Sequence, residues 1–206
     1  MGTVTFAYLW VDGDDDAWEK KFLKAFKDSD HTPVRVDGYG DDIKTGRMDT
    51  INSITTDYFV MCDPDDLIEP LHYNKAIGYL DEHPECSAVA FTIANALSDG
   101  RVYGYTNKGS FDLETLKRDP KALYLGVMYR TVSAQETINA LWDMEFEYYE
   151  WAFALVIAKN YEVKKFSDVA YTHRHHSRIP PTIPEPRENL IMYEETVIEL
   201  EFKGLL

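Results

Sequence analysis

The chain has 206 residues, of which 45% are hydrophobic and 28% are charged, as in a single globular domain rather than a disordered or fibrous chain. Its 21 Lys and Arg against 36 Asp and Glu give a net charge of −15, which disfavours binding to nucleic-acid backbones and to anionic membranes. No apolar run approaches the ~18–20 residues of a membrane helix, and the first residues lack a secretion signal. With two cysteines, the sequence predicts a cytoplasmic protein without a disulfide framework.

Strand-like and helix-like segments alternate in the first half of the chain. The expected elements are strand 3–11, helix 15–28, strand 33–37, helix 43–56, strand 57–62, helix 69–83 and strand 87–92. In the first helix, Trp18 falls at helical spacing with Phe22, Leu23 and Phe26, and the lysines form an opposite, solvated face. This alternation predicts an α/β fold with a mostly parallel central sheet flanked by helices.

The second half is expected to be less regular. After a turn at Asp99-Gly100, the pattern predicts a strand at 123–130, helices at 134–141 and 146–159, and a short strand pair within 161–172. Four prolines interrupt residues 178–187, and residues 188–203 have helical spacing. The sequence therefore predicts one domain over 1–178 and a proline-led arm with a helix over 179–206, which packs on the domain or on a partner and allows a homo-oligomer.

Carboxylates follow the buried strand 57–62. Asp63 and Asp65 are one residue apart, and such a pair can share a hard divalent cation. The alternative is a solvated turn, since Asp and Pro both favour turns. The strand before this pair and the helix after it favour a metal site. Ligands of such folds bind at the carboxyl ends of strands, where Asp12 and Asp37 also lie.

The stretch 57–91, DYFVMCDPDDLIEPLHYNKAIGYLDEHPECSAVAF, resembles the core of family-2-type glycosyltransferases with the GT-A fold. Upstream, Gly46-Arg47-Met48 stands where that family has Ala-Arg-Asn. The resemblance spans roughly residues 3–178. It implies a GT-A-like, Rossmann-like domain with a nucleotide-sugar half over 1–100 and an acceptor half over 101–178.

The same resemblance assigns donor-binding and metal-binding residues. A nucleotide sugar, most simply a UDP-sugar, is expected to contact Trp10, Asp12, Asp37, Arg47, Asp63 and Arg174. Mn²⁺ or Mg²⁺ is expected on Asp63, Asp65 and a histidine of the segment Tyr171–Ser177. The register of the family's Tyr-Arg-x-His pattern favours His176, with His173 as the competitor.

The residues Phe146–Trp151 stand where the family shows Glu-Asp-Trp at the start of the helix that carries the catalytic base. Tyr148 replaces the expected Asp, so Glu147 or Glu150 must supply the carboxylate. An exposed helix face is the alternative interpretation of these two residues. A single base without a covalent intermediate implies inversion at the anomeric carbon.

The resemblance thus predicts a metal-dependent inverting glycosyltransferase that moves a sugar to an acceptor hydroxyl, on a saccharide or another molecule. A nucleic-acid acceptor is disfavoured by the charge. Two alternatives stay open. Trp10-Val11-Asp12-Gly13 resembles the first block of Stealth-type sugar-phosphate transferases, which favours a sugar-phosphate or nucleotidyl transferase of related fold. The other is a non-catalytic nucleotide- or carbohydrate-binding module.

Overall fold

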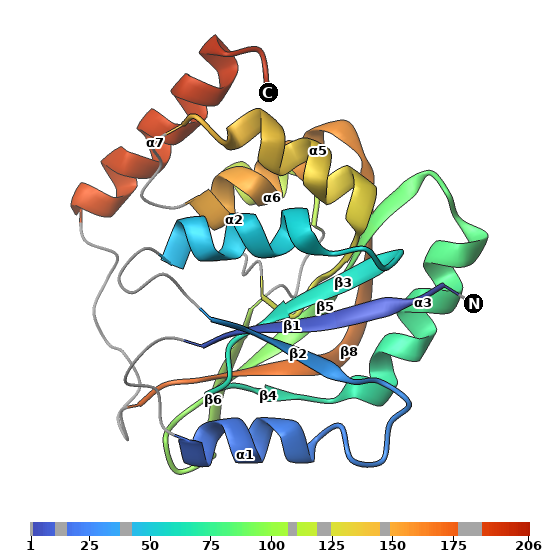
Figure 1. Cartoon of the computed structure of the whole chain (residues 1–206). Helices are drawn as coiled ribbons and strands as arrows, with labels where there is room; N and C mark the ends of the chain where they lie inside the picture. The colour runs from blue at the N-terminus through green and yellow to red at the C-terminus, as the bar shows by residue number, and fades with distance from the viewer. Residues whose placement is uncertain are drawn as a thin grey trace.

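The computed structural model describes residues 2–10, 16–37, 43–106, 111–118, 125–144, 149–176 and 187–206, without the side chains of residues 43 and 187–191. A central sheet lies between helices on both faces, with α2, α5 and α6 above it and α1 below it in Figure 1. The strands are β1 (Val4–Trp10), β2 (Pro33–Asp37), β3 (Tyr58–Cys62), β4 (Leu67–Ile68), β5 (Cys86–Ala96), β6 (Val102–Thr106), β7 (Met128–Arg130) and β8 (Glu162–Arg174). The helices are α1 (Asp16–Lys24), α2 (Ile43–Ser53), the 3₁₀ turn η1 (Pro70–His72), α3 (Tyr73–Glu82), α4 (Leu113–Arg118), α5 (Thr131–Leu141), α6 (Tyr149–Asn160) and α7 (Arg187–Phe202).

The strand order is β2-β1-β3-β7-β5-β8-β4, and β6 pairs with β5. Two parallel blocks make up the longest ladders, one of β1 with β2 and β3, the other of β5 with β8. The short strand β7 runs antiparallel to both β3 and β5 and joins the two blocks. The predicted α/β class, with a central sheet flanked by helices, is therefore confirmed. The sheet contains both parallel and antiparallel strand pairs.

Burial on both faces explains why β1 and β3 are almost entirely apolar. All five residues of β3 are buried. On one face, Phe59 stacks on Tyr129, and Tyr129 meets Phe153 of α6 edge to face. On the other face, Phe6 of β1 contacts Tyr73 of α3, with ring centroids 5.2 Å apart. A strand covered on both sides loses the polar alternation of a half-exposed one.

Residues 161–172 do not form the expected strand pair. Residues 162–172 belong to one strand, β8, which pairs in parallel with β5 over its length. The register shifts three times along this ladder, between Cys86 and Ala88, Ala90 and Thr92, and Thr92 and Ile93. Such irregularities break the regular alternation of side chains along a strand. Two short elements, β4 and α4, were also not predicted.

The C-terminal helix α7 packs on the domain. Leu200 is fully buried, and Tyr193 meets Trp151 of α6 edge to face with ring centroids 5.1 Å apart. Lys117 of α4 forms an ion pair with Glu201 at 2.9 Å. Of the two arrangements expected for the C-terminal arm, packing on the domain or on a partner, α7 adopts the first. No helix in the described part of the chain is long and apolar enough to cross a membrane.

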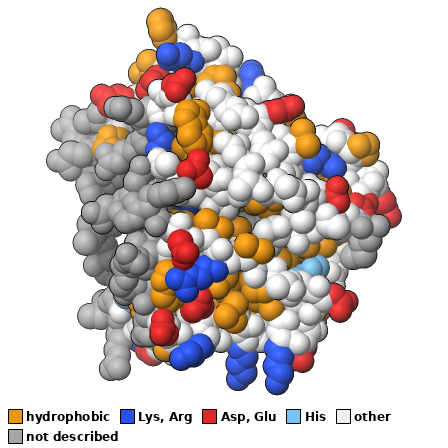
Figure 2. Space-filling model, viewed as in Figure 1, with side chains coloured by type: hydrophobic (Ala, Val, Ile, Leu, Met, Phe, Trp, Pro, Cys, Tyr) orange, Lys and Arg blue, Asp and Glu red, His pale blue; other side chains and the backbone are white. Residues whose placement is uncertain are grey.

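The lysines of α1 point to solvent, as expected. Lys20 and Lys24 are exposed, and blue side chains protrude below α1 at the lower edge of Figure 2. The opposite side of the helix holds Phe22, whose ring lies 5.1 Å from that of Tyr8 on β1. The amphipathic pattern therefore fixes which side of α1 faces the sheet.

Gly126 lies at a close approach between the loop before β7 and the strand β8. Its φ is +71°, and its N–H donates to the carbonyl of Met61 at 3.0 Å. A Cβ at this position would lie 2.5 Å from Cγ of Tyr171. The Tyr171 hydroxyl accepts the backbone N–H of Asp63 at 3.0 Å. The missing side chain therefore lets Tyr171 reach the loop that follows β3.

Replacing Gly126 by Ala should lower the free energy of unfolding by more than the strain of a positive φ, which is about 1–2 kcal/mol. The collision with Tyr171 should add roughly 1–3 kcal/mol, as in other overpacked cores. Gly100→Ala is the matched control, since Gly100 also has positive φ but nothing lies within 4 Å of its Cβ position. Urea unfolding measures both variants, and equal losses would show that the Tyr171 contact does not matter.

Candidate functional site

The loop after β3 carries three carboxylates. One oxygen from each of Asp63, Asp65 and Asp66 lies within 4.8 Å of the others. The loop starts with a turn in which the N–H of Asp66 donates to the carbonyl of Asp63 at 3.2 Å. It ends in β4, which pairs with β8 through Leu67 and Ile68. The loop thus carries the chain from the end of β3 to the end of β8, and two strands, β7 and β5, lie between these in the sheet.

Asp66 anchors the end of β8 to this loop. Its side chain is 1% exposed and accepts the backbone N–H of Arg174 at 2.8 Å. Its other oxygen lies 3.3 Å from Nδ1 of His173. The hydrogen bond to Asp66 raises the pKa of His173, against the opposing effect of burial. Asp66 and His173 therefore form a structural pair in this arrangement.

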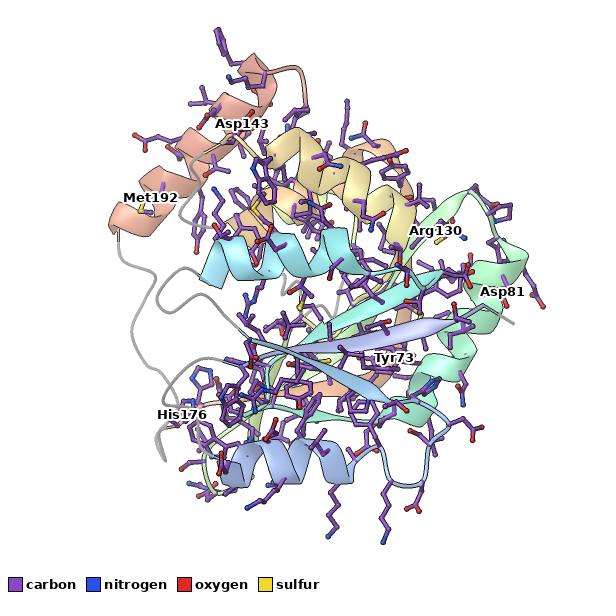
Figure 3. The ribbon with its side chains drawn as sticks, in the orientation of Figure 1. Tyr73, Asp81, Arg130, Asp143, His176 and Met192 are labelled. Atoms are coloured by element: carbon purple, nitrogen blue, oxygen red, sulfur yellow. The ribbon has the colours of Figure 1, made fainter. Side chains whose placement is uncertain are left out.

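Asp65 and His176 come together at the same place. Nε2 of His176 lies 2.9 Å from Oδ2 of Asp65, and Arg174 donates from Nε to the carbonyl of Asp65. Burial raises the pKa of Asp65, and His176 opposes that shift. In Figure 3, His176 lies at the left end of the sheet, near the start of α1, and Asp81 and Arg130 lie at the opposite end.

This donor set fits a hard divalent cation. Neighbouring ligands of an octahedral ion with bonds of about 2.1 Å lie about 3 Å apart, which matches the separation of Asp65 and His176. Asp66 is already committed to Arg174 and His173. Of the predicted ligands, Asp65 and His176 thus lie at a separation that could suit a bound ion, with Asp63 beside them.

Arg47 connects two other predicted residues. From α2, its Nη2 donates to Oδ1 of Asp63 at 2.8 Å, and its Nη1 donates to Oε1 of Glu150 at the start of α6. Burial raises the pKa of Asp63 to about 6, although Arg47 lowers it in part. The guanidinium of Arg47 thus joins the loop after β3 to the helix that was expected to carry the base.

Two of the predicted donor-binding residues lie on the edge of the sheet. Trp10 and Asp37 are partners in the register of β1 and β2. Asp37 is 79% exposed and accepts a hydrogen bond from Nε of Arg35 at 2.8 Å. The guanidinium of Arg35 lies 4.5 Å above the centre of the Trp10 ring. Sequence analysis missed Arg35, although its position two residues before Asp37 in a strand places both on one face.

Trp18 is the second residue that sequence analysis missed. Helical spacing grouped it with Phe22 and the core, but its ring lies against His176, with centroids 4.8 Å apart. Leu23, from the same predicted group, is exposed. Spacing alone does not distinguish a core residue from one at the end of the sheet, because α1 extends along the strands. Asp12 and Glu147 lie outside the described residues.

Solved structures share this fold. A crystal structure of residues 1–349 of TarS, a glycosyltransferase from S. aureus, matches with a TM-score of 0.62 and 14% identity over 83% of this chain and 60% of that chain. Its complex with UDP-GlcNAc matches with a TM-score of 0.64 and 13% identity, covering 96% of this chain and 66% of that one. The complex with UDP gives a TM-score of 0.60 and 13% identity, covering 96% and 65%.

The chain has a GT-A-like glycosyltransferase fold. At these identities the likeness establishes the fold, and the chain spans less than two thirds of each of these TarS structures. No protein-family model and no curated protein sequence matches the chain. In this GT-A-like fold, the acidic loop after β3 and the end of β8 form one cluster with Arg47 and Glu150.

The raised pKa of Asp63 predicts how stability depends on pH. Asp63 has a folded pKa of about 6, above the ~3.9 of an unfolded aspartate, so the folded state binds its proton more tightly. This group therefore lowers the free energy of unfolding of the metal-free protein as pH rises from about 4 through 6. Asp63→Asn should remove this pH-dependent contribution. In urea unfolding, the variant should therefore gain stability relative to the wild type as pH rises from 4.5 to 7.5.

Asp168→Asn is the control for this experiment. Its ion pair with Lys75 lowers the pKa of Asp168, so its contribution is lost only as pH falls below the ordinary aspartate range. The difference between this variant and the wild type should stay constant from pH 4.5 to 7.5. A constant difference for Asp63→Asn as well would contradict the raised pKa.

Proposed function

We propose that this chain is a glycosyltransferase that moves a sugar from a nucleotide sugar to an acceptor hydroxyl. The meeting of Asp65 and His176 at 2.9 Å, beside Arg47 and Asp63, carries the proposal, because these residues would form a cation site next to a cationic side chain where GT-A-like folds bind ligands. The TarS complexes with UDP and UDP-GlcNAc support a UDP-sugar as the donor.

The donor end of the site must balance the charge of a diphosphate. A divalent cation, Mn²⁺ or Mg²⁺, held by Asp65 and His176 with Asp63 beside them, would supply the positive charge that stabilises a leaving diphosphate. Arg47 and Arg174 add fixed positive charge on either side of the loop. Asp66 and His173 keep the end of β8 in place for this task.

The nucleobase would bind at the edge formed by β1 and β2. The Asp37 carboxylate can accept a hydrogen bond from the imide N–H of uracil, a donor that cytosine lacks. Trp10 lies there with its ring against the guanidinium of Arg35, 4.5 Å from the ring centre. The assignment of Asp12 to the donor site stays a prediction from the sequence.

Transfer requires a base on the acceptor side. The acceptor oxygen attacks the anomeric carbon, the bond to the diphosphate oxygen breaks, and a carboxylate takes the hydroxyl proton. One displacement without a covalent intermediate inverts the anomeric configuration. We keep Glu147 as the first candidate for the base and Glu150 as the second. Glu150 would first have to leave the guanidinium of Arg47.

Replacing Asp65 should remove metal binding and leave the fold intact. Asp65→Ala should abolish the Mn²⁺-dependent rise in melting temperature that UDP produces, and it should lower the slow hydrolysis of UDP-sugars by at least about tenfold, because half of the ligand pair is gone. Asp168→Ala, which removes a surface ion pair, is the matched control and should behave as the wild type. A full UDP and Mn²⁺ response in Asp65→Ala would overturn the metal assignment.

The catalytic base is tested by replacing each candidate glutamate with glutamine, whose side chain has nearly the same shape but no carboxylate. Glu147→Gln should retain donor binding and lose transfer by roughly 10²-fold or more, the range for a lost general base. Initial rates with a panel of saccharide acceptors give the readout. If Glu150→Gln is inactive and Glu147→Gln is not, the two roles are exchanged. If both variants stay active, base catalysis from this segment is excluded, and a sugar-phosphate transferase becomes the better hypothesis.

A further inference from the structure

We propose that Trp18 is a positioning residue that holds the imidazole of His176 toward Asp65. The inference rests on the proposed function, because it concerns the cation site formed by these two residues. The indole of Trp18 lies 4.8 Å from the imidazole, centroid to centroid, at an interplanar angle of 43°. The ring of His176 therefore has Asp65 at Nε2 and the indole against one face.

The rotation of α1 directs Trp18 to this place. Phe22, one turn after Trp18, is buried against Tyr8 of β1. Glu19 accepts a hydrogen bond from the Tyr8 hydroxyl at 2.8 Å. These two contacts fix α1 on the sheet, and Trp18 then extends from its first turn toward the ends of the strands. The position of the indole is thus set by the core and not by the ligand.

His176 needs such a contact because its side chain is 61% exposed. An exposed side chain loses rotamer freedom when it binds a ligand, and that loss lowers affinity. Metal-binding histidines are commonly oriented by a carboxylate or carbonyl at the second ring nitrogen. Here an aromatic face restricts the ring before the ion arrives. Packing by Trp18 would therefore raise the affinity of the site without touching the ion.

The indole also forms a wall of a small cavity beside the site. Trp18, Ser98, Arg174, His175 and His176 line a volume of about 180 Å³. The cavity leaves space next to the imidazole, so the Trp18 contact restrains His176 without closing the site. A tryptophan that only filled a gap in the surface would have no effect on ion binding.

The first test examines the metal-free protein by NMR. The ring current of the indole should shift the His176 ring protons upfield, and Trp18→Ala should abolish that shift. His83, which stacks on Tyr79 at 4.1 Å, is the internal reference and should not change. An unchanged His176 spectrum in Trp18→Ala would overturn the proposal.

The second test measures Mn²⁺ binding in the presence of UDP, by the electron paramagnetic resonance signal of free Mn²⁺. Trp18→Ala should weaken binding by about tenfold or more, the effect usual for residues that orient a metal ligand. Trp18→Phe should restore most of the affinity, because it keeps an aromatic face. Trp142→Ala, which removes an exposed tryptophan at the end of α5, should have no effect.

The two proposals fail in different ways. Equal Mn²⁺ affinity of the wild type and Trp18→Ala would overturn the role of Trp18 and leave the proposed function intact. No Mn²⁺ binding by the wild type with UDP would overturn the metal site, and the role of Trp18 with it. If Trp18→Ala does not fold in urea-unfolding controls, Trp18→Phe and Trp18→Leu decide, since Leu fills space without a flat ring and should not restore affinity.

Discussion

The candidate site depends on the buried carboxylate of Asp66. The strands that bring Asp65 and His176 are not neighbours, because β7 and β5 lie between β3 and β8. The two residues meet because the loop after β3 crosses to β8, where β4 pairs with β8 and the buried Asp66 accepts the backbone N–H of Arg174. A buried carboxylate without partners costs several kcal/mol. Moving the end of β8 away from the loop would leave Asp66 without these partners and is therefore unfavourable. The partners of this buried carboxylate thus help to set the geometry of the site.

The charges around this loop explain why a cation would be favoured at Asp65. Three carboxylates within 4.8 Å repel one another, and burial adds to the cost of keeping them ionised. Arg47 offsets the charge of Asp63, and Asp66 accepts the backbone N–H of Arg174 and lies 3.3 Å from Nδ1 of His173. Asp65 is left with His176, a mostly exposed imidazole. Asp65 is therefore the one whose partner is itself mostly exposed, and its own side chain, 22% exposed, is open to an incoming ion.

The sequence alone predicts those features that depend on the preferences of a few consecutive residues. A buried strand followed by Asp-Pro-Asp-Asp predicts a strand end with carboxylates, because strand and turn preferences act over a few residues. The bridge from Asp63 through Arg47 to Glu150 joins residues up to 103 positions apart, and no local pattern contains it. The strand pair expected within 161–172 failed for a related reason. The shifts in register along β5 and β8 disturb the alternation, and only the finished ladder shows them. Trp18 was grouped with the core, because periodicity gives the side of a helix but not its position along the sheet.

Stability and site geometry are linked in this fold through Tyr171. Its ring is fully buried against Gly126, and its hydroxyl holds the N–H of Asp63. The carbonyl of Gly126 in turn accepts the hydroxyl of Tyr73, which packs on Phe6 in the centre of the sheet. Because the packing of large rings is nearly incompressible, a shift at any of these positions must move the others. The backbone at Asp63 is therefore positioned by the same contacts that close the core, and the acidic loop cannot relax independently of the sheet that carries it.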